Sequence, residues 1–200
     1  MTPHALTMTS NAALLGWVGG IARLTQAAEL LWCDGSAAER GEMVVSAAMA
    51  GALFSESRRP AHVRNGFPMT SPRGFEQHTF VCTPTRAEAG RTSRWMAPSV
   101  AYRKLEKLVR GSLRASTLYV VPDVVENLAL RQGRVVVELT NSYHGILSMG
   151  VSGRMGKEAL DALGESNAFS RGFHVCLSSA PKHLLVCHFP QDDATWSMSS

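Results

Sequence analysis

The sequence lacks the features that mark membrane and secreted proteins. No apolar run approaches the ~18 to 20 residues that a membrane-spanning helix needs. The apolar stretch 11–21 is interrupted by glycines and lacks the basic start of a signal peptide. These absences predict a cytoplasmic protein with no membrane partner.

Cysteine is scarce and widely spaced. The four cysteines (Cys33, Cys82, Cys176 and Cys187) form no CxxC pair, which argues against a zinc ribbon. A disulfide framework is not expected in a chain of this size and class. Three of the four lie in apolar, strand-like contexts, where a free buried thiol is the usual state. We therefore expect free thiols and no metal site.

The sequence also lacks a helix-turn-helix signal, an aromatic-basic RNA motif and a zinc finger, so no nucleic-acid partner is expected. The net charge is a modest +4. The arginines gather in segments read as loops: Arg58, Arg59, Arg64, Arg91, Arg94, Arg131 and Arg134. Because a guanidinium binds carboxylates and phosphates in a bidentate manner, this pattern suits a small anionic ligand better than nucleic acid, and a solvated surface position stays the alternative for each arginine.

Apolar periodicity predicts alternating helices and strands. Helices are expected over 11–24, 36–50, 98–113 and 155–163, and the first three have candidate caps at Ser10 or Asn11, at Ser36 and at Ser99. Strands are expected over 29–33, 79–82, 118–121, 134–140, 144–152 and 184–189, the third ended by Pro122 and the last followed by a polar tail. This order predicts an α/β (or α+β) fold with a central mixed sheet flanked by helices. A single domain over 1–200 is expected, with 1–10 and 198–200 loose.

Two segments have the composition of functional loops. The segment 58–74 is long and rich in Pro, Gly and Arg, which is typical of functional loops. The segment 79–98, TFVCTPTRAEAGRTSRWMAP, places Trp95 and Met96 in a polar loop, where they need a pocket, a partner or a packing role.

Several motifs in fixed order identify a family. "LLWCDGSAAE", "FVCTPTRAEAGRTSRWMAP", "STLYVVP", "VVVELTNSYHGILSMGVSGRMGKEALDALG" and "VCHFPQDDATWSMSS" together resemble the N-terminal domain of GTP-dependent phosphoenolpyruvate carboxykinase over about 17–197. The resemblance implies that domain's mixed sheet flanked by helices. The family interconverts oxaloacetate and phosphoenolpyruvate with GTP, manganese and magnesium.

The sequence departs from the family in what it omits. It has no GxxxxGK motif followed by Ser or Thr to hold phosphates, and no evident metal-ligand set. The glycine- and tyrosine-rich segment that follows the tryptophan matched by Trp196 is absent. We therefore expect no nucleotide or metal cofactor and no kinase chemistry by this chain alone.

The resemblance suggests substrate-binding residues. Arg64 is the best match to the arginine that clamps the substrate carboxylate, and Arg59 is the competing alignment. Arg94 replaces an asparagine before the matched Trp95 and Met96. That arginine can bind a new anion or form a salt bridge, and Trp95 can contact ligand or pack in the interior.

Other changes suggest acid-base chemistry. Asn141, Tyr143 and His144 stand where the family has Asp, Pro and Tyr, and "DVVENLALRQGR" replaces a Gly- and Pro-rich loop. At a strand start, Tyr143 and His144 can serve as general acid and base, because histidine titrates near neutral pH. His62 is a comparable candidate. His174, His183 and His188 are interpreted as loop or strand residues without an assigned role.

Three functions remain open. The leading one is a repurposed domain that acts on a small carboxylate or keto acid without GTP or metal, by lyase, isomerase or cyclase chemistry. The second is a non-catalytic domain that binds a metabolite or a protein, including a second copy through the former interdomain face. The third is a fragment of a longer carboxykinase.

Overall fold

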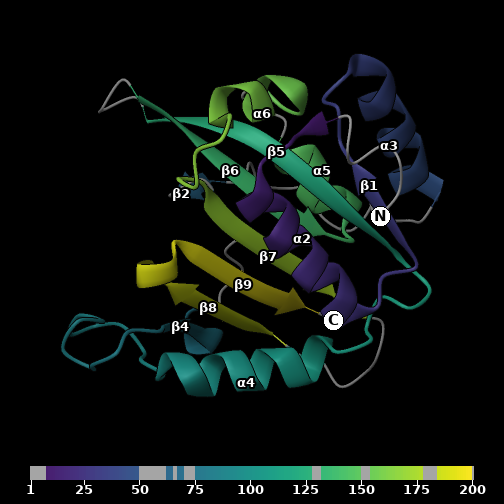
Figure 1. Ribbon diagram of the computed structural model, residues 1–200. Helices are drawn as coiled ribbons and strands as arrows, with labels where there is room; N and C mark the ends of the chain where they lie inside the picture. The colour runs from purple at the N-terminus through teal and green to yellow at the C-terminus, as the bar shows by residue number, and fades with distance from the viewer. Residues whose placement is uncertain are drawn as a thin grey trace.

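In a computed structural model of the chain, the described residues are 8–49, 62–64, 67–69, 75–127, 132–149, 154–177 and 184–199 (Figure 1). Arg59, Arg131 and most of the segment 50–74 lie outside these ranges, so the predictions made for them stay untested.

A seven-stranded mixed sheet forms the centre of the molecule, in the order β1-β5-β6-β7-β9-β8-β4. The pairs β5/β6 and β8/β9 are antiparallel, and the other four neighbouring pairs are parallel. The strands are β1 (Glu29–Trp32), β4 (Thr79–Val81), β5 (Thr117–Asn127), β6 (Gln132–Thr140), β7 (Ser170–Cys176), β8 (Leu185–Phe189) and β9 (Ala194–Ser199). A separate antiparallel hairpin pairs β2 (His62–Arg64) with β3 (Phe67–Met69). The predicted mixed sheet is confirmed.

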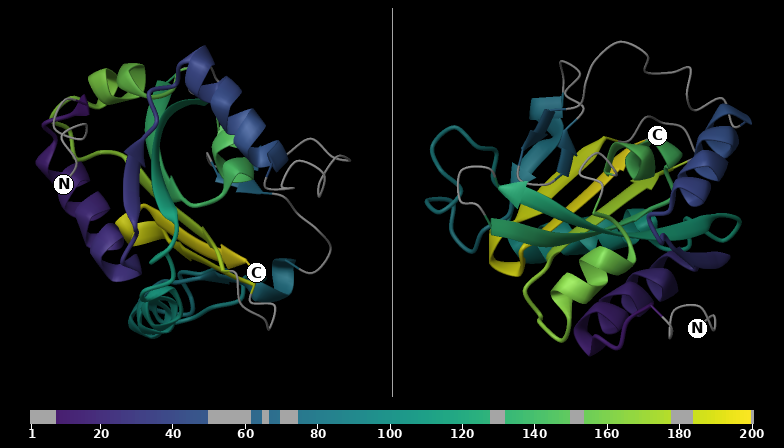
Figure 2. Two further views of the ribbon diagram at one scale, coloured as in Figure 1. Left: turned by 90° about the vertical axis from the view of Figure 1, so that its right-hand side faces the viewer. Right: turned by 90° about the horizontal axis from the view of Figure 1, so that it is seen from above.

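Helices cover the two faces of the sheet unequally (Figure 2). On one face, α2 (Ala12–Thr25), α4 (Pro98–Val109) and α6 (Lys157–Leu163) pack on the larger apolar core. On the other, α3 (Ala37–Met49) and α5 (Tyr143–Met149) enclose a small second core. Two short 3-10 turns are η1 (Phe75–His78) and η2 (Pro190–Asp192). No helix in the described part of the chain is long and apolar enough to cross a membrane.

Capping residues explain where the helices begin. The Asn11 side chain accepts from the Leu14 N–H at 2.9 Å and donates to the carbonyl oxygens of Gly164 and Ser166, which ties α2 to the end of α6. Ser36 accepts from the Glu39 N–H at 3.1 Å, which confirms the predicted cap of α3. The prediction that Ser99 caps α4 is wrong: that helix begins with Pro98 after Ala97.

Pro122 does not end a strand, contrary to our expectation, because β5 continues to Asn127. Pro122 pairs with Val137 on β6, and β1 has already ended on the opposite side. The missing N–H therefore faces the side of β5 that β1 has left, where the backbone of 154–156 lies and the Gly156 N–H donates to the Pro122 carbonyl oxygen at 2.9 Å. The segment "DVVENLALRQGR" consequently includes the end of β5 and the start of β6.

Three further predictions are corrected by the structure. The strand expected over 144–152 overlaps helix α5, because a short apolar run does not distinguish a helix from a strand. Tyr143 and His144 therefore start a helix and not a strand. Strands β7 and β9 were not expected, and residues 198–199 belong to β9, with Met198 only 1% exposed, so they are not loose. All four cysteines are free, and Cys33, Cys82 and Cys187 are buried, as predicted.

Candidate functional site

The two faces of the central strands differ in polarity. Register places Leu139, Phe173, Trp196 and Cys187 side by side in a row that joins the larger apolar core. The side chains that alternate with them point to the opposite face. We call these residues the polar face: Glu138, Thr140, Ser170, His174, Cys176, His188, Thr195, Ser197 and Ser199. It lies on the side of α3 and α5, because Val136, two residues before Glu138, packs in their core.

Two histidines of the polar face are held by hydroxyl groups of β9. The Nδ1 atom of His174 lies 2.8 Å from Ser197 Oγ, and that of His188 lies 2.9 Å from Thr195 Oγ1. Burial lowers the pKa of His174 to about 4 and also lowers the pKa of His188. Both rings are therefore neutral near pH 7, so each offers one donor and one acceptor nitrogen. The exposed thiol of Cys176 lies 3.4 Å from His174 Nε2.

Glu138 is a buried residue of the polar face whose hydrogen bonding is incomplete. The residue is 5% exposed, and its Oε2 atom has no hydrogen-bond partner. Burial raises the pKa of Glu138 to about 8, so the carboxyl group is protonated at neutral pH and can donate a hydrogen bond. Sequence analysis missed this residue, although a glutamate within the apolar run "VVVELT" was the available signal.

Asn141 joins two strand ends beside the polar face. Its amide nitrogen donates to the Cys176 carbonyl oxygen at 3.0 Å, and its amide oxygen accepts from the Cys176 N–H at 2.8 Å. The structure thus gives Asn141 an architectural role at the carboxyl ends of β6 and β7. The predicted contact of Asn141 with substrate stays a prediction.

The predicted acid-base pair lies in the first turn of α5. The half-buried Tyr143 hydroxyl is 3.4 Å from that of Tyr119, and the two rings are 5.8 Å apart. Burial is the main cause that raises the pKa of Tyr119, followed by the hydrogen bond to Tyr143. The side chain of His144 is outside the description, so catalysis by Tyr143 or His144 stays a prediction.

The β2–β3 hairpin approaches the same region. His62 and Arg64 both belong to β2, and β3, its partner strand, lies against α5. The backbone that carries these two candidates therefore lies near the helix that begins with Tyr143 and His144. The side chains of His62 and Arg64 are outside the description.

Arg94 and Trp95 lie elsewhere, at the edge strand β4, which β7, β9 and β8 separate from β6. The Arg94 guanidinium stands 5.1 Å from the centroid of the Phe80 ring, which packs on the larger apolar core. The half-buried Trp95 donates its Nε1–H to the Thr83 carbonyl oxygen at 2.9 Å, and Met96 packs on the same core. The structure therefore does not bring Arg94 and Trp95 together with Asn141 and Tyr143. The predicted contact of Trp95 with a ligand stays a prediction.

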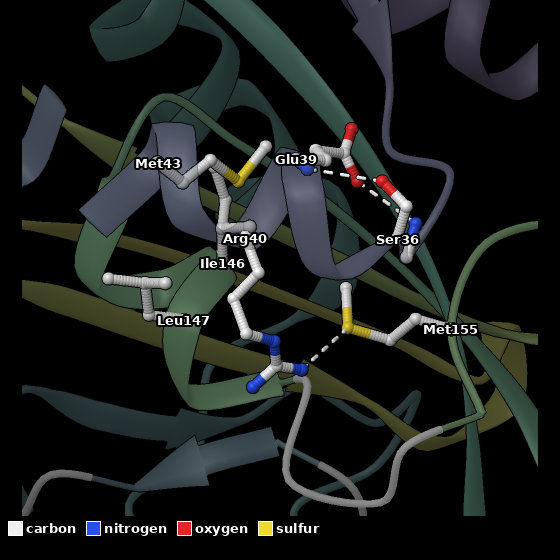
Figure 3. Close-up of a pocket in the computed structure, with 8 residues that line it drawn as sticks. Ser36, Glu39, Arg40, Met43, Ile146, Leu147 and Met155 are labelled. Carbon is white, nitrogen blue, oxygen red and sulfur yellow. Dashed lines mark hydrogen bonds between the residues drawn. The ribbon is translucent and has the colours of Figure 1, made fainter. Parts of the chain in front are cut away.

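Two hollows lined by described residues can be compared with the candidate residues. The first, between α3 and α5, measures only about 10 Å³, and Figure 3 shows Arg40 reaching across it toward Met155. The second measures about 260 Å³ and includes Arg94, but neither Tyr143 nor Asn141 lines it. No three His, Cys, Asp or Glu side chains of the described residues converge as a metal-binding group.

Comparison with known proteins agrees with this fold. Residues 16–200 match the model of the phosphoenolpyruvate carboxykinase N-terminal domain. A phosphoenolpyruvate carboxykinase (GTP) of Anaeromyxobacter dehalogenans is 42% identical over 100% of this chain and 34% of its own length. Those of Paenarthrobacter aurescens and Chlamydia pneumoniae are each 32% identical, over 96% and 97% of this chain. The chain thus spans about a third of the length of these curated relatives.

Proposed function

Because this chain belongs to the phosphoenolpyruvate carboxykinase family through that family's N-terminal domain, we propose that it binds a small carboxylate or keto acid on the polar face. The observation that carries the proposal is the position of the hairpin with Arg64 beside α5, on the face where Glu138 lies buried and incompletely hydrogen-bonded.

The chemistry of the polar face suits such a ligand. A buried polar group without a partner costs free energy, so a face rich in hydroxyl and imidazole groups favours an occupant that forms hydrogen bonds. A protonated Glu138 can donate to a carboxylate or keto oxygen, and the neutral ring of His188, whose Nδ1 atom lies beside Thr195 Oγ1, can offer its Nε2 atom. The guanidinium of Arg64 would supply the compensating charge through bidentate hydrogen bonds.

Ligand-dependent thermal stabilisation tests this proposal. Oxaloacetate or phosphoenolpyruvate at ~100 times its dissociation constant should add ~2.7 kcal/mol to the stability of the folded state. We expect the Arg64→Ala variant to lose this stabilisation. The variant Arg103→Ala, which removes an exposed arginine of α4 on the opposite face of the sheet, should keep it. An equal response in Arg64→Ala and the wild type, or no response in the wild type, would refute carboxylate binding at this face.

The same assay examines the cofactor prediction. The relatives named phosphoenolpyruvate carboxykinase (GTP) are about three times as long as this chain, and GTP dependence is a property of those proteins. For this chain we propose a nucleotide- and metal-independent activity of the lyase, isomerase or cyclase type. GTP and Mn²⁺ should then leave the melting temperature unchanged, and NMR of the bound keto acid should reveal a product without either addition.

A further inference from the structure

A hollow of about 260 Å³ opens beside β4, between η1, α4 and the start of β8. We call it the basic hollow. Its titratable lining side chains are His78, Arg94 and Lys104, and the lining contains no carboxylate. Because charges of one sign around a concave surface concentrate counter-ions, this hollow attracts anions.

The position of Arg94 is fixed by two contacts. The Val81 N–H donates to the Arg94 carbonyl oxygen at 2.8 Å, which fixes the backbone against β4. The guanidinium then lies over the Phe80 ring at 5.1 Å. A cation–π contact uses the face of the ring and leaves the N–H donors of the guanidinium available. No carboxylate among the described residues forms an ion pair with Arg94 or Lys104.

The rest of the lining is mainly apolar. Lys104 and Leu108 are one turn apart on α4, so they lie on the same side of the helix and both line the hollow. Phe80 and Leu185 contribute further apolar surface. A fully hydrated inorganic ion would leave this surface unused, whereas an anion with an apolar body would cover it.

We propose that the basic hollow binds a small organic anion in which a carboxylate or phosphate head is attached to an apolar body. Arg94 and Lys104 bind the head, and Phe80, Leu108 and Leu185 contact the body. This site is separate from the polar face, because Phe80 belongs to the apolar core on the other face of the sheet. It therefore does not depend on the function proposed above.

Isothermal titration calorimetry with phenyl phosphate, benzoate and inorganic phosphate tests the site. Phenyl phosphate or benzoate should bind, the preferred one identifying the head group, and inorganic phosphate should bind at least about tenfold more weakly, because it lacks an apolar body. Loss of a charge-assisted hydrogen bond predicts a roughly tenfold or greater loss of affinity in Arg94→Ala and in Lys104→Ala.

Matched controls come from the same two segments. Arg91 and Lys107 are exposed neighbours that do not line the hollow, so Arg91→Ala and Lys107→Ala should bind as the wild type does. Arg64→Ala should also leave this binding unchanged, which separates it from carboxylate binding at the polar face. Equal loss in Arg94→Ala and Arg91→Ala would overturn the proposal. So would amide shifts on titration that cluster at His174 and Ser197 and leave Arg94 and Lys104 unmoved.

Discussion

The Asn141 side chain binds both backbone polar groups of Cys176, at 3.0 Å through its nitrogen and at 2.8 Å through its oxygen. Two reciprocal hydrogen bonds thus connect the residue after β6 to the last residue of β7. They fix the carboxyl ends of these parallel strands beside each other, at the border of the polar face.

Replacing Asn141 with alanine should destabilise the fold. Each hydrogen bond contributes about 0.5–1.5 kcal/mol, so we expect a loss of about 1–3 kcal/mol in the free energy of unfolding, measured by urea denaturation. Asn141→Asp retains the acceptor but turns a carboxylate oxygen toward the Cys176 carbonyl oxygen, so it should be at least as destabilising as Asn141→Ala. If Asn141→Ala were as stable as the wild type, the two hydrogen bonds between Asn141 and Cys176 would contribute nothing to the stability of the fold.

Gly156 should not tolerate a side chain. It has a positive φ of 66°, and a Cβ on it would lie 2.0 Å from the Asp34 carbonyl oxygen. We expect Gly156→Ala to lose at least about 2 kcal/mol of stability, because the two backbone segments must separate. The matched control is Gly16→Ala in helix α2, where a Cβ meets nothing within 4 Å. That change should stabilise the helix by about 0.5–1 kcal/mol, and thermal denaturation compares the two variants.

Local sequence signals were sufficient to predict the elements that have an apolar face or a capping residue. The Asn11 and Ser36 caps and the apolar stripe of α4 were visible in the sequence, as was strand β4. Strand β9 was not, because Ser197 and Ser199 point to the polar face and make the segment resemble a solvated tail. The expectation that Pro122 ends a strand was wrong for a related reason. Only the sheet order shows that the Pro122 nitrogen lies on the side of β5 where β1 has ended.

The polar face illustrates why a site is harder to predict than its strands. Glu138, His174 and Thr195 come from three strands, and only the register of β6, β7 and β9 places them on one face. His174 and His188 received no role from the sequence, since nothing local distinguishes them from other strand histidines. The family resemblance suggested Arg64 as a substrate ligand, which stays a prediction, and it could not show that Arg94 lies over Phe80 at the far edge of the sheet.

Glu138 should make the protein less stable as the pH rises. Its pKa is raised to about 8 in the folded state, from 4.5, so the folded state binds more protons than the unfolded state between these values. The contribution of Glu138 is therefore fully present below about pH 4.5 and is lost progressively up to about pH 8, at up to about 1.4 kcal/mol per pH unit.

The isosteric variant Glu138→Gln isolates this effect. Its free energy of unfolding, measured by urea denaturation at several pH values, should lack that downward slope, so the difference from the wild type should grow in favour of the variant as the pH rises. Parallel pH profiles of Glu138→Gln and the wild type would show that the carboxyl group titrates normally and is not buried as described.

His174 should make the protein less stable as the pH falls. Burial lowers its pKa to about 4 in the folded state, from 6.5, so the unfolded state binds the extra proton first on acidification. The stability associated with a neutral His174 is present above about pH 6.5 and falls toward pH 4 by up to about 1.4 kcal/mol per pH unit. His174→Gln should remove this acid sensitivity, and the control His78→Gln, at an exposed position, should retain it. Glu138 and His174 act in opposite directions between about pH 4.5 and 6.5, so their two contributions offset each other there. Each single variant should reveal the slope of the other group, and a double variant should keep only the pH dependence of the remaining groups, including His188 and Glu39. A flat profile in both single variants would contradict the shifted pKa values of both groups.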